Sequence, residues 1–488
     1  MSDVTEQASE MMFDEAKYAA LVKQALRDLH ANVSREKKFT FSDYTKDQII
    51  SFLKSPETNA ASIRKASIQM YQNSEQYRRL ISYHAYLPLW AYTLFPSAFN
   101  RRKIKPEAFQ KQYYKAAAMI ERMNLHHELR KALQIAYREG VLYGAIWANN
   151  TSWFIQRIDP DISVLSSIED GTWMYAVDMS RIAEEDLFRY PPEFTNMHRE
   201  YIKTGEKYQE VPSQISFCLK ADETVSYPIP LFASVLPSIF DLENNKELAD
   251  EATEIANYKL LAMKVPLRDD GQPSMPWQLV MQYYEHLANN LPKYVGVAAV
   301  PMDIKDINFE KSGVGQETDE VEQATRNFWY STGTSPLLFG DATNTTAAAL
   351  NLSIRTAEEI AFASMAQCER LINRHLKTLP GSIKFQINIL PVTVFNQEKM
   401  IGYYKEASTY GLPVKLAYNA AIGIPPTTVE GSAYVENDVL HLKDIFVPLS
   451  STHTESSEDR AGRPTLSDDD ISEAGEQTRE DDEDANKE

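Results

Sequence analysis

Residues 344–379 read NTTAAALNLSIRTAEEIAFASMAQCERLINRHLKTL. Apolar or small residues recur along this stretch with the i, i+3, i+4, i+7 spacing of one helix face for about eight turns: Leu350, Ile354, Ala357, Ala361, Met365, Cys368, Ile372, His375 and Leu379. Polar residues from Thr343 to Thr346 can cap its start, and Pro380-Gly381 ends it. The helix would span on the order of 50 Å, which is longer than an average globular domain needs. The spacing by itself predicts a core strut.

Composition indicates a folded protein. The 488 residues are 43% hydrophobic and 11% aromatic, which is enough for the cores of about two to four domains. Cys218 and Cys368 are the two cysteines, too few for a disulfide framework or a metal cluster, and they fit a reducing compartment. The first residues, Met1 to Glu6, show neither a basic segment nor an apolar segment, so we expect no signal peptide.

One stretch invites a membrane interpretation. Leu80 to Asn100 contains no Asp, Glu, Lys or Arg and has arginines on both sides. Prolines, polar residues and three tyrosines interrupt it. We therefore expect a buried helix followed by an extended segment, with a transmembrane helix as the alternative.

The net charge of −19 is unevenly distributed. Residues 451–488 carry 14 acidic and 4 basic residues, which accounts for −10 and leaves −9 for residues 1–450. This tail has little apolar surface to bury, so we expect it to be disordered. Its Asp468-Asp469-Asp470 run lacks the convergent geometry of a metal site. An acidic body also has the wrong sign for holding a nucleic-acid backbone tightly.

The pattern of the first half predicts an α+β region. Residues 1–44 read as a mobile arm, and helices follow up to Gly140. The period then changes from 3.6 to 2, which predicts strands at 153–158 and 172–177, a helix from Pro191 to Tyr201 and a short strand at 215–219.

Two helices that flank a small unit follow. Pro237 begins an amphipathic helix that continues to Met263, with glutamates on its other faces. Residues 266–315 predict a compact unit with a helix at 275–291 and strands at 294–300 and 303–309, and Glu317 to Ser331 forms the second helix. After the long central helix, the pattern predicts a strand at 383–395 and helices at 397–409 and 414–421.

The sequence lacks the common catalytic motifs. It has no phosphate-binding glycine loop of the Gly-x-x-x-x-Gly-Lys-Ser/Thr type and no Gly-x-Ser-x-Gly around Ser335. His126-His127-Glu128 lacks the i, i+4 histidine pair that binds zinc from one helix face, and Cys368 lies on the apolar stripe. We expect no catalytic residue, no metal and no cofactor.

Several local motifs, taken in order, resemble the portal proteins of tailed bacteriophages of the siphophage type. They are Ser67-Ile68-Gln69-Met70-Tyr71 with Tyr77-Arg78-Arg79, Tyr190-Pro191-Pro192-Glu193-Phe194, Tyr227-Pro228-Ile229-Pro230-Leu231-Phe232, Thr332-Gly333-Thr334-Ser335-Pro336-Leu337-Leu338-Phe339-Gly340, Gly423-Ile424-Pro425-Pro426 and Gly462-Arg463-Pro464. None is specific alone. The resemblance lies in their order together with the order of helices and strands over residues 45–450.

The resemblance implies the portal fold with the following parts. They are a wing at 45–232, a first stem helix at 233–265, a clip at 266–315, a second stem helix at 316–335, a tunnel loop at 336–346, a long wing helix and wing strand at 347–395 and a helical crown at 396–450, between the arm at 1–44 and the tail at 451–488.

The resemblance also implies a function. Portal proteins form a ring, commonly of twelve subunits, at one capsid vertex, and they conduct double-stranded DNA during packaging and ejection. Implied partners are the terminase large subunit, a head–tail adaptor, and the major capsid and scaffold proteins, with assembly in the bacterial host cytoplasm and a final location in the virion. No membrane contact is implied.

Candidate channel residues follow from the same resemblance. The tunnel loop would project toward DNA with Phe339, Gly340, Asp341, Ala342, Thr343, Asn344, Thr345 and Thr346. The stem would line the channel with some of Glu243, Glu247, Glu251 and Glu254, which repel phosphates, and the clip would offer Lys264, Arg268 and Lys293 as basic groups. The alternatives are an enzyme such as a packaging motor or nuclease, a membrane-associated protein, and another oligomeric scaffold without enzymatic activity.

Overall fold

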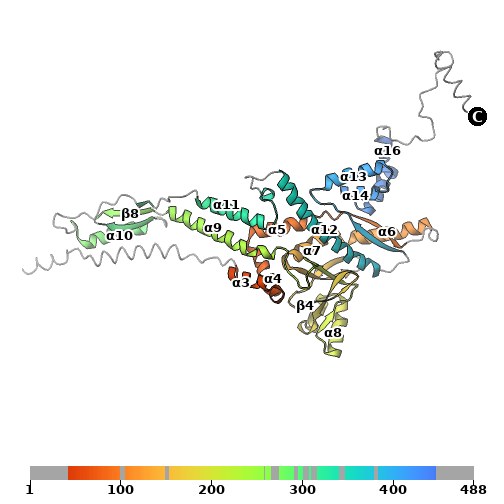
Figure 1. Ribbon diagram of the computed structural model, residues 1–488, viewed down its shortest axis with the longest axis horizontal. Coiled ribbons are helices and arrows are strands. Elements are labelled where there is room, and N and C mark those ends of the chain that lie inside the picture. The colour runs from red at the N-terminus through yellow and green to blue at the C-terminus, as the bar shows by residue number, and fades with distance from the viewer. Residues whose placement is uncertain are drawn as a thin grey trace, which may run out of the picture.

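The computed structural model describes residues 42–98, 105–148, 153–257, 259–264, 274–290, 295–300, 307–308, 316–339, 347–378 and 383–446. Helices and sheets mix in one body, and a pair of long helices projects from it (Figure 1). This confirms the predicted α+β class. The acidic tail and most of the predicted N-terminal arm lie outside the described residues. The last three residues of that arm, 42–44, are described, and Tyr44 packs edge-on against Phe52.

Five helices form the N-terminal part of the body. They are α3 (Lys46–Lys54), α4 (Pro56–Asn73), α5 (Glu75–Tyr86), α6 (Pro106–Arg122) and α7 (Leu125–Glu139). Local sequence explains their ends: Thr45 and Gln48 form a capping box on α3, and Ser74 caps α5 by accepting from the Tyr77 N–H. Gly140 ends α7 with φ +87°, and a Cβ there would lie 2.6 Å from the backbone of Ile229, so only glycine fits.

Antiparallel strands form three small sheets in the body. One has the order β3 (Trp153–Arg157), β2 (Val141–Ala148), β7 (Ser216–Lys220), the second β4 (Ser163–Glu169), β5 (Thr172–Asp178), β6 (Tyr208–Glu210), and the third pairs β1 (Tyr92–Ala98) with β11 (Lys384–Ile389). Helix α8 (Pro192–Thr204) lies beside the second sheet (Figure 1). Short 3-10 turns η1 (Met179–Arg181) and η2 (Glu184–Arg189) lie between β5 and α8, and two more occur further along the chain at η3 (Ala233–Val235) and η4 (Pro336–Phe339).

The body contains strands that the sequence pattern did not predict. Strand β2 is buried along its first six residues, so it shows no alternation, and residues 163–169, which form β4, were given no strand prediction. The predicted strand at 383–395 is shorter than expected and ends at Ile389, two residues before Pro391. The stretch around Leu80 to Asn100 contains the end of α5 and then β1, as expected. Among the described residues, no helix has the length and hydropathy that crossing a membrane requires.

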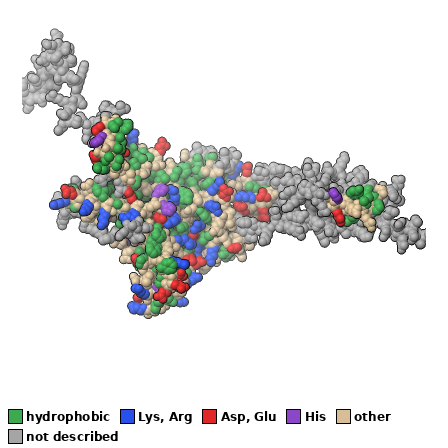
Figure 2. Space-filling view, turned by 180° about the vertical axis from the view of Figure 1, so that it is seen from behind, with side chains coloured by type: hydrophobic (Ala, Val, Ile, Leu, Met, Phe, Trp, Pro, Cys, Tyr) green, Lys and Arg blue, Asp and Glu red, His purple; other side chains and the backbone are tan. Residues whose placement is uncertain are grey.

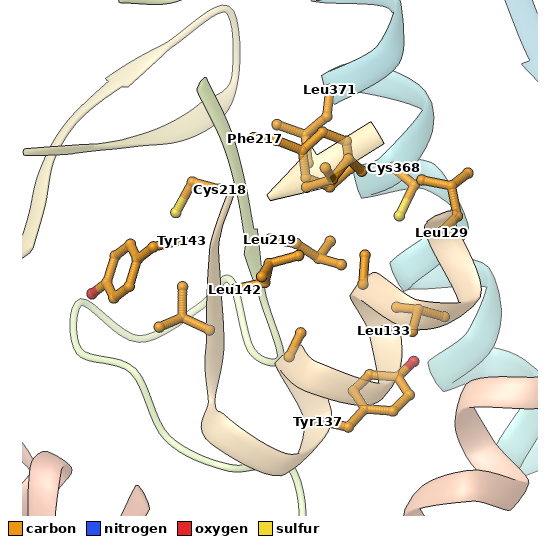
Figure 3. Close-up of a cluster of buried hydrophobic side chains, with 14 of the residues drawn as sticks. Leu129, Leu133, Tyr137, Leu142, Tyr143, Phe217, Cys218, Leu219, Cys368 and Leu371 are labelled. Carbon is orange, nitrogen blue, oxygen red and sulfur yellow. The ribbon is translucent and has the colours of Figure 1, made fainter. Parts of the chain in front are cut away.

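The long helix α12 (Ala347–Thr378) is confirmed and is the central strut of the body. Its stripe from Ala357 to His375 is buried. Figure 3 shows Cys368 beside Leu129 of α7 and Leu371 beside Phe217 of β7, while Cys218 of β7 points to the opposite face of the sheet. Burial raises the pKa of the Cys218 thiol to about 12 and also raises that of Cys368, so both thiols are protonated at neutral pH.

Polar side chains of α12 bond to the edges of two sheets. The Gln367 amide accepts from the Lys220 N–H (2.8 Å) and donates to the Lys220 carbonyl (3.0 Å) at the β7 edge. Asn373 makes the same pair of bonds with the N–H and carbonyl of Ile387 in β11 (2.8 and 2.9 Å). The helix therefore satisfies strand groups that would otherwise be buried without partners.

The projecting pair consists of α9 (Leu236–Asn257) and α11 (Gln316–Ser331), which we call the stalk. At its far end lies a tip unit of β8 (Lys259–Lys264), α10 (Trp277–Asn290), β9 (Val295–Val300) and β10 (Ile307–Asn308), with strand order β10-β8-β9. The expected helix from Pro237 to Met263 is thus wrong in its last part. Residues 259–264 instead pair in parallel with β9, because sheet pairing within the tip unit outweighs the helical pattern.

A C-terminal helical unit closes the described chain. It consists of α13 (Gln397–Thr409), α14 (Lys415–Ile422), α15 (Pro426–Ala433), the π-helical turn η5 (Tyr434–Val439) and α16 (Leu442–Ile445). The first two helices confirm the prediction, and the last three elements were not predicted. Its core is small, with Leu390, Val392, Ala420 and Ala421 as its buried members among the described residues.

Candidate functional site

The stalk is the most distinctive feature of the molecule. Helices α9 and α11 pack side by side, and α9 leads away from the body to the tip unit while α11 returns from it (Figure 1). At 1.5 Å per residue, α9 is about 33 Å long. The stalk therefore holds the tip unit well away from the body.

Apolar side chains anchor the stalk in the core of the body. Leu236, Ile239 and Leu242 at the start of α9 are fully buried, as is Phe328 near the end of α11, and Trp329 is almost so. Burial of each such side chain contributes about 1.5–3 kcal/mol. The root of the stalk is thus part of the body rather than a loose attachment.

Polar contacts fix the same root to the N-terminal helices. Lys46 of α3 forms an ion pair with Asp241 (2.5 Å), and Lys246 bonds to Gln76 of α5 (3.2 Å) and to Glu243 (3.0 Å). These pairs are partly exposed, so their role is to orient α9 more than to stabilise it.

Residues 332–339 are the described part of the segment between the stalk and α12, and we call them the joint. Gly333 adopts φ +71°, which favours glycine. The Ser353 hydroxyl on α12 accepts from the Ser335 N–H (2.8 Å) and donates to the Gly333 carbonyl (3.2 Å). The Phe339 ring stacks on Trp329 of α11 with 3.9 Å between centroids, so the joint folds back on the stalk root.

His84 of α5 contacts the joint from the interior of the body. Its ring packs against Phe232 and Tyr83, and its Nε2 is 3.5 Å from the Thr334 hydroxyl. Its Nδ1 is buried without a hydrogen-bond partner among the described residues. Burial lowers the pKa of His84 from 6.5 to about 4, so the ring is neutral at neutral pH.

Some of the predicted channel residues lie within the described part of the chain, and the others lie outside it. Glu243 and Glu247 lie on the described part of α9, the first half-buried and the second exposed, and the positions of Glu251 and Glu254 follow on the same helix. Lys264 ends strand β8. Of the predicted tunnel loop, Phe339 is described and packs on the stalk root, whereas Gly340, Asp341, Ala342, Thr343, Asn344, Thr345 and Thr346 lie outside the described residues, as do Arg268 and Lys293.

The stalk is strongly acidic. Helix α9 carries six acidic residues and one basic residue, and α11 carries four and one. Figure 2 shows red carboxylate side chains on the described part of the stalk near its root. Such a surface repels phosphates.

Sequence reasoning included Thr332 to Gly340 among the motifs of the resemblance but missed the contacts of the joint. Nothing in the sequence indicated that Ser353 and His84 would contact these residues, since His84 is 250 positions from Thr334. Within the described ranges, no group of three or more His, Cys, Asp or Glu side chains is arranged to hold a metal ion.

No known protein family matches the chain, and no curated protein matches it.

Proposed function

We propose that this chain is the subunit of a phage portal: a ring-shaped DNA conduit at one capsid vertex. In this assignment the stalk is the stem, the tip unit is the clip, residues 336–346 are the tunnel loop, α12 is the long wing helix and the C-terminal helical unit is the crown.

The observation that carries the proposal is the geometry of the stalk. Two helices pack side by side and hold a small α/β unit at their far end, and along the chain they are followed, after the joint and residues 340–346, by one 32-residue helix. Copies arranged around an axis with their stalks together would enclose a passage. A head-to-tail contact that closes on itself produces such a ring.

The negative charge of the stalk favours passage of DNA over tight binding of DNA. The excess of acidic residues on both helices, including Glu243, Glu247, Glu251 and Glu254, keeps a duplex from adhering to the wall. The partners of this function would be double-stranded DNA, the terminase large subunit, a head–tail adaptor, and the major capsid and scaffold proteins. The ring would assemble in the bacterial host cytoplasm and remain in the virion.

A second candidate is an oligomeric scaffold without a channel. The C-terminal helical unit favours it, because large apolar side chains such as Tyr410, Ile445 and Phe446 are exposed there, and Figure 2 shows apolar side chains gathered at that end. Oligomers that lack a central opening would support this candidate.

Negative-stain electron microscopy of the purified full-length chain tests the proposal. We expect ring-shaped top views with a central hole wide enough for a DNA duplex. Monomers with ATPase activity, or closed assemblies without a hole, would contradict it.

Deletion of Asp341 to Thr346 tests the tunnel-loop assignment. We expect rings to form as in the wild type, because Phe339 and Ser353 still hold the joint, and DNA packaging to decrease in an assay with terminase and proheads. Unchanged packaging would show that the loop is assigned wrongly while leaving the ring intact as a proposal.

A further inference from the structure

The joint is bonded to three helices, and its hydrogen bond to α5 is the longest of the set. On the stalk side, the Thr334 N–H donates to the Trp329 carbonyl at the end of α11 (3.3 Å). On the α12 side, the Ser353 hydroxyl makes its two bonds of 2.8 and 3.2 Å. On the α5 side, the described hydrogen bond joins the Thr334 hydroxyl to His84 Nε2 over 3.5 Å, which is long for such a bond. Attachment to α5 therefore depends on one weak contact with a titratable ring.

A cavity of about 270 Å³ borders the joint. Gly333, Thr334, Ser335 and Pro336 line it together with the end of α11 and the start of α12. Thr334 thus borders open space as well as contacting His84. Because protein interiors are otherwise closely packed, this space gives the joint room to shift away from α5 without displacing its neighbours.

The surroundings of His84 contain no charge that would stabilise a proton on its ring. Residues 227–236, which include Phe232, and the joint itself contain no charged side chain. Burial and, secondarily, Glu358 raise the pKa of Tyr83 to about 12, so Tyr83 is neutral. The charged groups that lie on α5 or have a described contact with it are bonded elsewhere: Glu75, Arg78, Arg79, Arg130 of α7, Lys246 of α9 and Glu358 of α12.

A protonated His84 needs two hydrogen-bond acceptors, and the closed joint does not provide them. Nδ1 is buried without a partner among the described residues, and Nε2 has the distant Thr334 hydroxyl. A buried cation without acceptors is costly. Movement of the joint would let water reach the ring and remove this cost.

We propose that the joint is an acid-sensitive hinge: protonation of His84 releases residues 332–339 from α5 while the rest of the body stays folded. The released joint shifts toward the adjoining cavity and turns about Gly333. The inference does not depend on ring formation, because every residue that carries it lies within one chain.

The two protonation equilibria determine how strongly release depends on pH. The pKa of His84 is about 4 while the joint is closed, and it returns to about 6.5 when water reaches the ring. The ratio of released to closed molecules should therefore rise roughly 30-fold from pH 7.5 to pH 5.

Thiol labelling of Ser335→Cys by dithiodipyridine, which reacts at both pH values, measures release. The Ser335 hydroxyl is buried and has no hydrogen-bond partner among the described residues, so a thiol in its place should disturb little. Ser51→Cys, at an exposed position of α3, gives the reference rate at each pH. We expect the rate for Ser335→Cys, relative to Ser51→Cys, to rise roughly 30-fold between pH 7.5 and pH 5.

The natural cysteines distinguish release of the joint from unfolding of the body. Cys218 and Cys368 are buried, so they are labelled only when the body opens. We expect the thiol of Ser335→Cys to react faster than both at pH 5, as measured by mass spectrometry of the labelled peptides.

His84→Leu in the Ser335→Cys chain tests the role of the ring. The side chain is then neutral at both pH values, so the relative labelling rate should no longer depend on pH. His84→Gln replaces it if rapid labelling of Cys218 and Cys368 at pH 7.5 shows that the leucine variant is unfolded. The proposal is overturned if the thiol of Ser335→Cys reacts no faster than Cys218 and Cys368, if its relative rate does not rise at pH 5, or if the rise persists in the folded His84 variant.

Discussion

His84 is the residue at which stalk, joint and body meet. It contacts Phe232 before α9, Tyr83 in α5 and Thr334 in the joint. Its buried ring has no carboxylate partner in the described contacts, so nothing there offsets the cost of a positive charge. Protonation of this one side chain would disturb three segments at once.

This arrangement predicts a pH dependence of stability. The pKa of His84 is about 4 in the folded protein and about 6.5 in the unfolded chain, so between these values the unfolded chain binds more protons. Stability should therefore fall as the pH decreases from 6.5 toward 4 and should be unaffected above 6.5. Between pH 7.5 and pH 5, protonation of His84 in the unfolded chain should lower the free energy of unfolding by about 2 kcal/mol.

Denaturant unfolding at both pH values checks this expectation. His84→Leu should reduce the loss of stability on acidification, although not abolish it, because burial also lowers the pKa of His375. His127→Gln, at a side chain that is 67% exposed, is the control and should behave as the wild type. An identical pH dependence in His84→Leu and wild type would contradict the assignment.

At the scale of elements, α12 is held by its side-chain amides as well as by its apolar stripe. Gln367→Met keeps the length of the side chain but leaves the Lys220 N–H and carbonyl without partners. We expect a loss of about 2–4 kcal/mol in the free energy of unfolding, because both groups are buried. The Lys220 amide should also exchange hydrogen faster.

Hydrogen exchange followed by mass spectrometry measures this effect. Glu359→Gln on the exposed face of the same helix is the matched control, and it should change neither exchange at Lys220 nor stability. If both variants protect Lys220 equally, then the Gln367 amide does not stabilise the strand edge.

The success of sequence reasoning depended on the kind of element. The long helix was predictable because its stripe repeats over many turns, and α13 because its ends are marked by a turn on each side. Strand β2 was not predicted because it is buried on both faces and so shows no alternation of apolar and polar residues. Strand β8 was predicted as helix because its short apolar run has no hydrophobic periodicity that distinguishes strand from helix. The contacts of the joint could not be predicted, because they join residues far apart in the chain.

At the scale of the whole molecule, the acidic stalk makes a prediction about DNA. The variant carries four substitutions: Glu243→Gln, Glu247→Gln, Glu251→Gln and Glu254→Gln. If these helices face a passage, removing the charges should increase retention of double-stranded DNA at about 50 mM salt, and the retention should disappear near 200 mM. Electrophoretic mobility and filter binding measure it.

A variant with the same change in charge provides the control. Its four glutamates lie on exposed surfaces of the body: Glu57, Glu184, Glu185 and Glu206. We expect this variant to bind DNA as the wild type does. Equal DNA retention by both variants would mean that binding depends on net charge alone and that the stalk does not contact DNA in preference to the rest of the surface.

The bonds between α12 and two strand edges have a mechanical consequence. Gln367 and Asn373 lie on one stiff rod and each secures a different sheet, so neither sheet can turn about the rod unless hydrogen bonds break. Torque applied to the stalk would reach both sheets together, and the compliant point would be the turn around Gly333, which the Ser353 hydroxyl of α12 joins by two hydrogen bonds. Bending of this protein under load should therefore concentrate there.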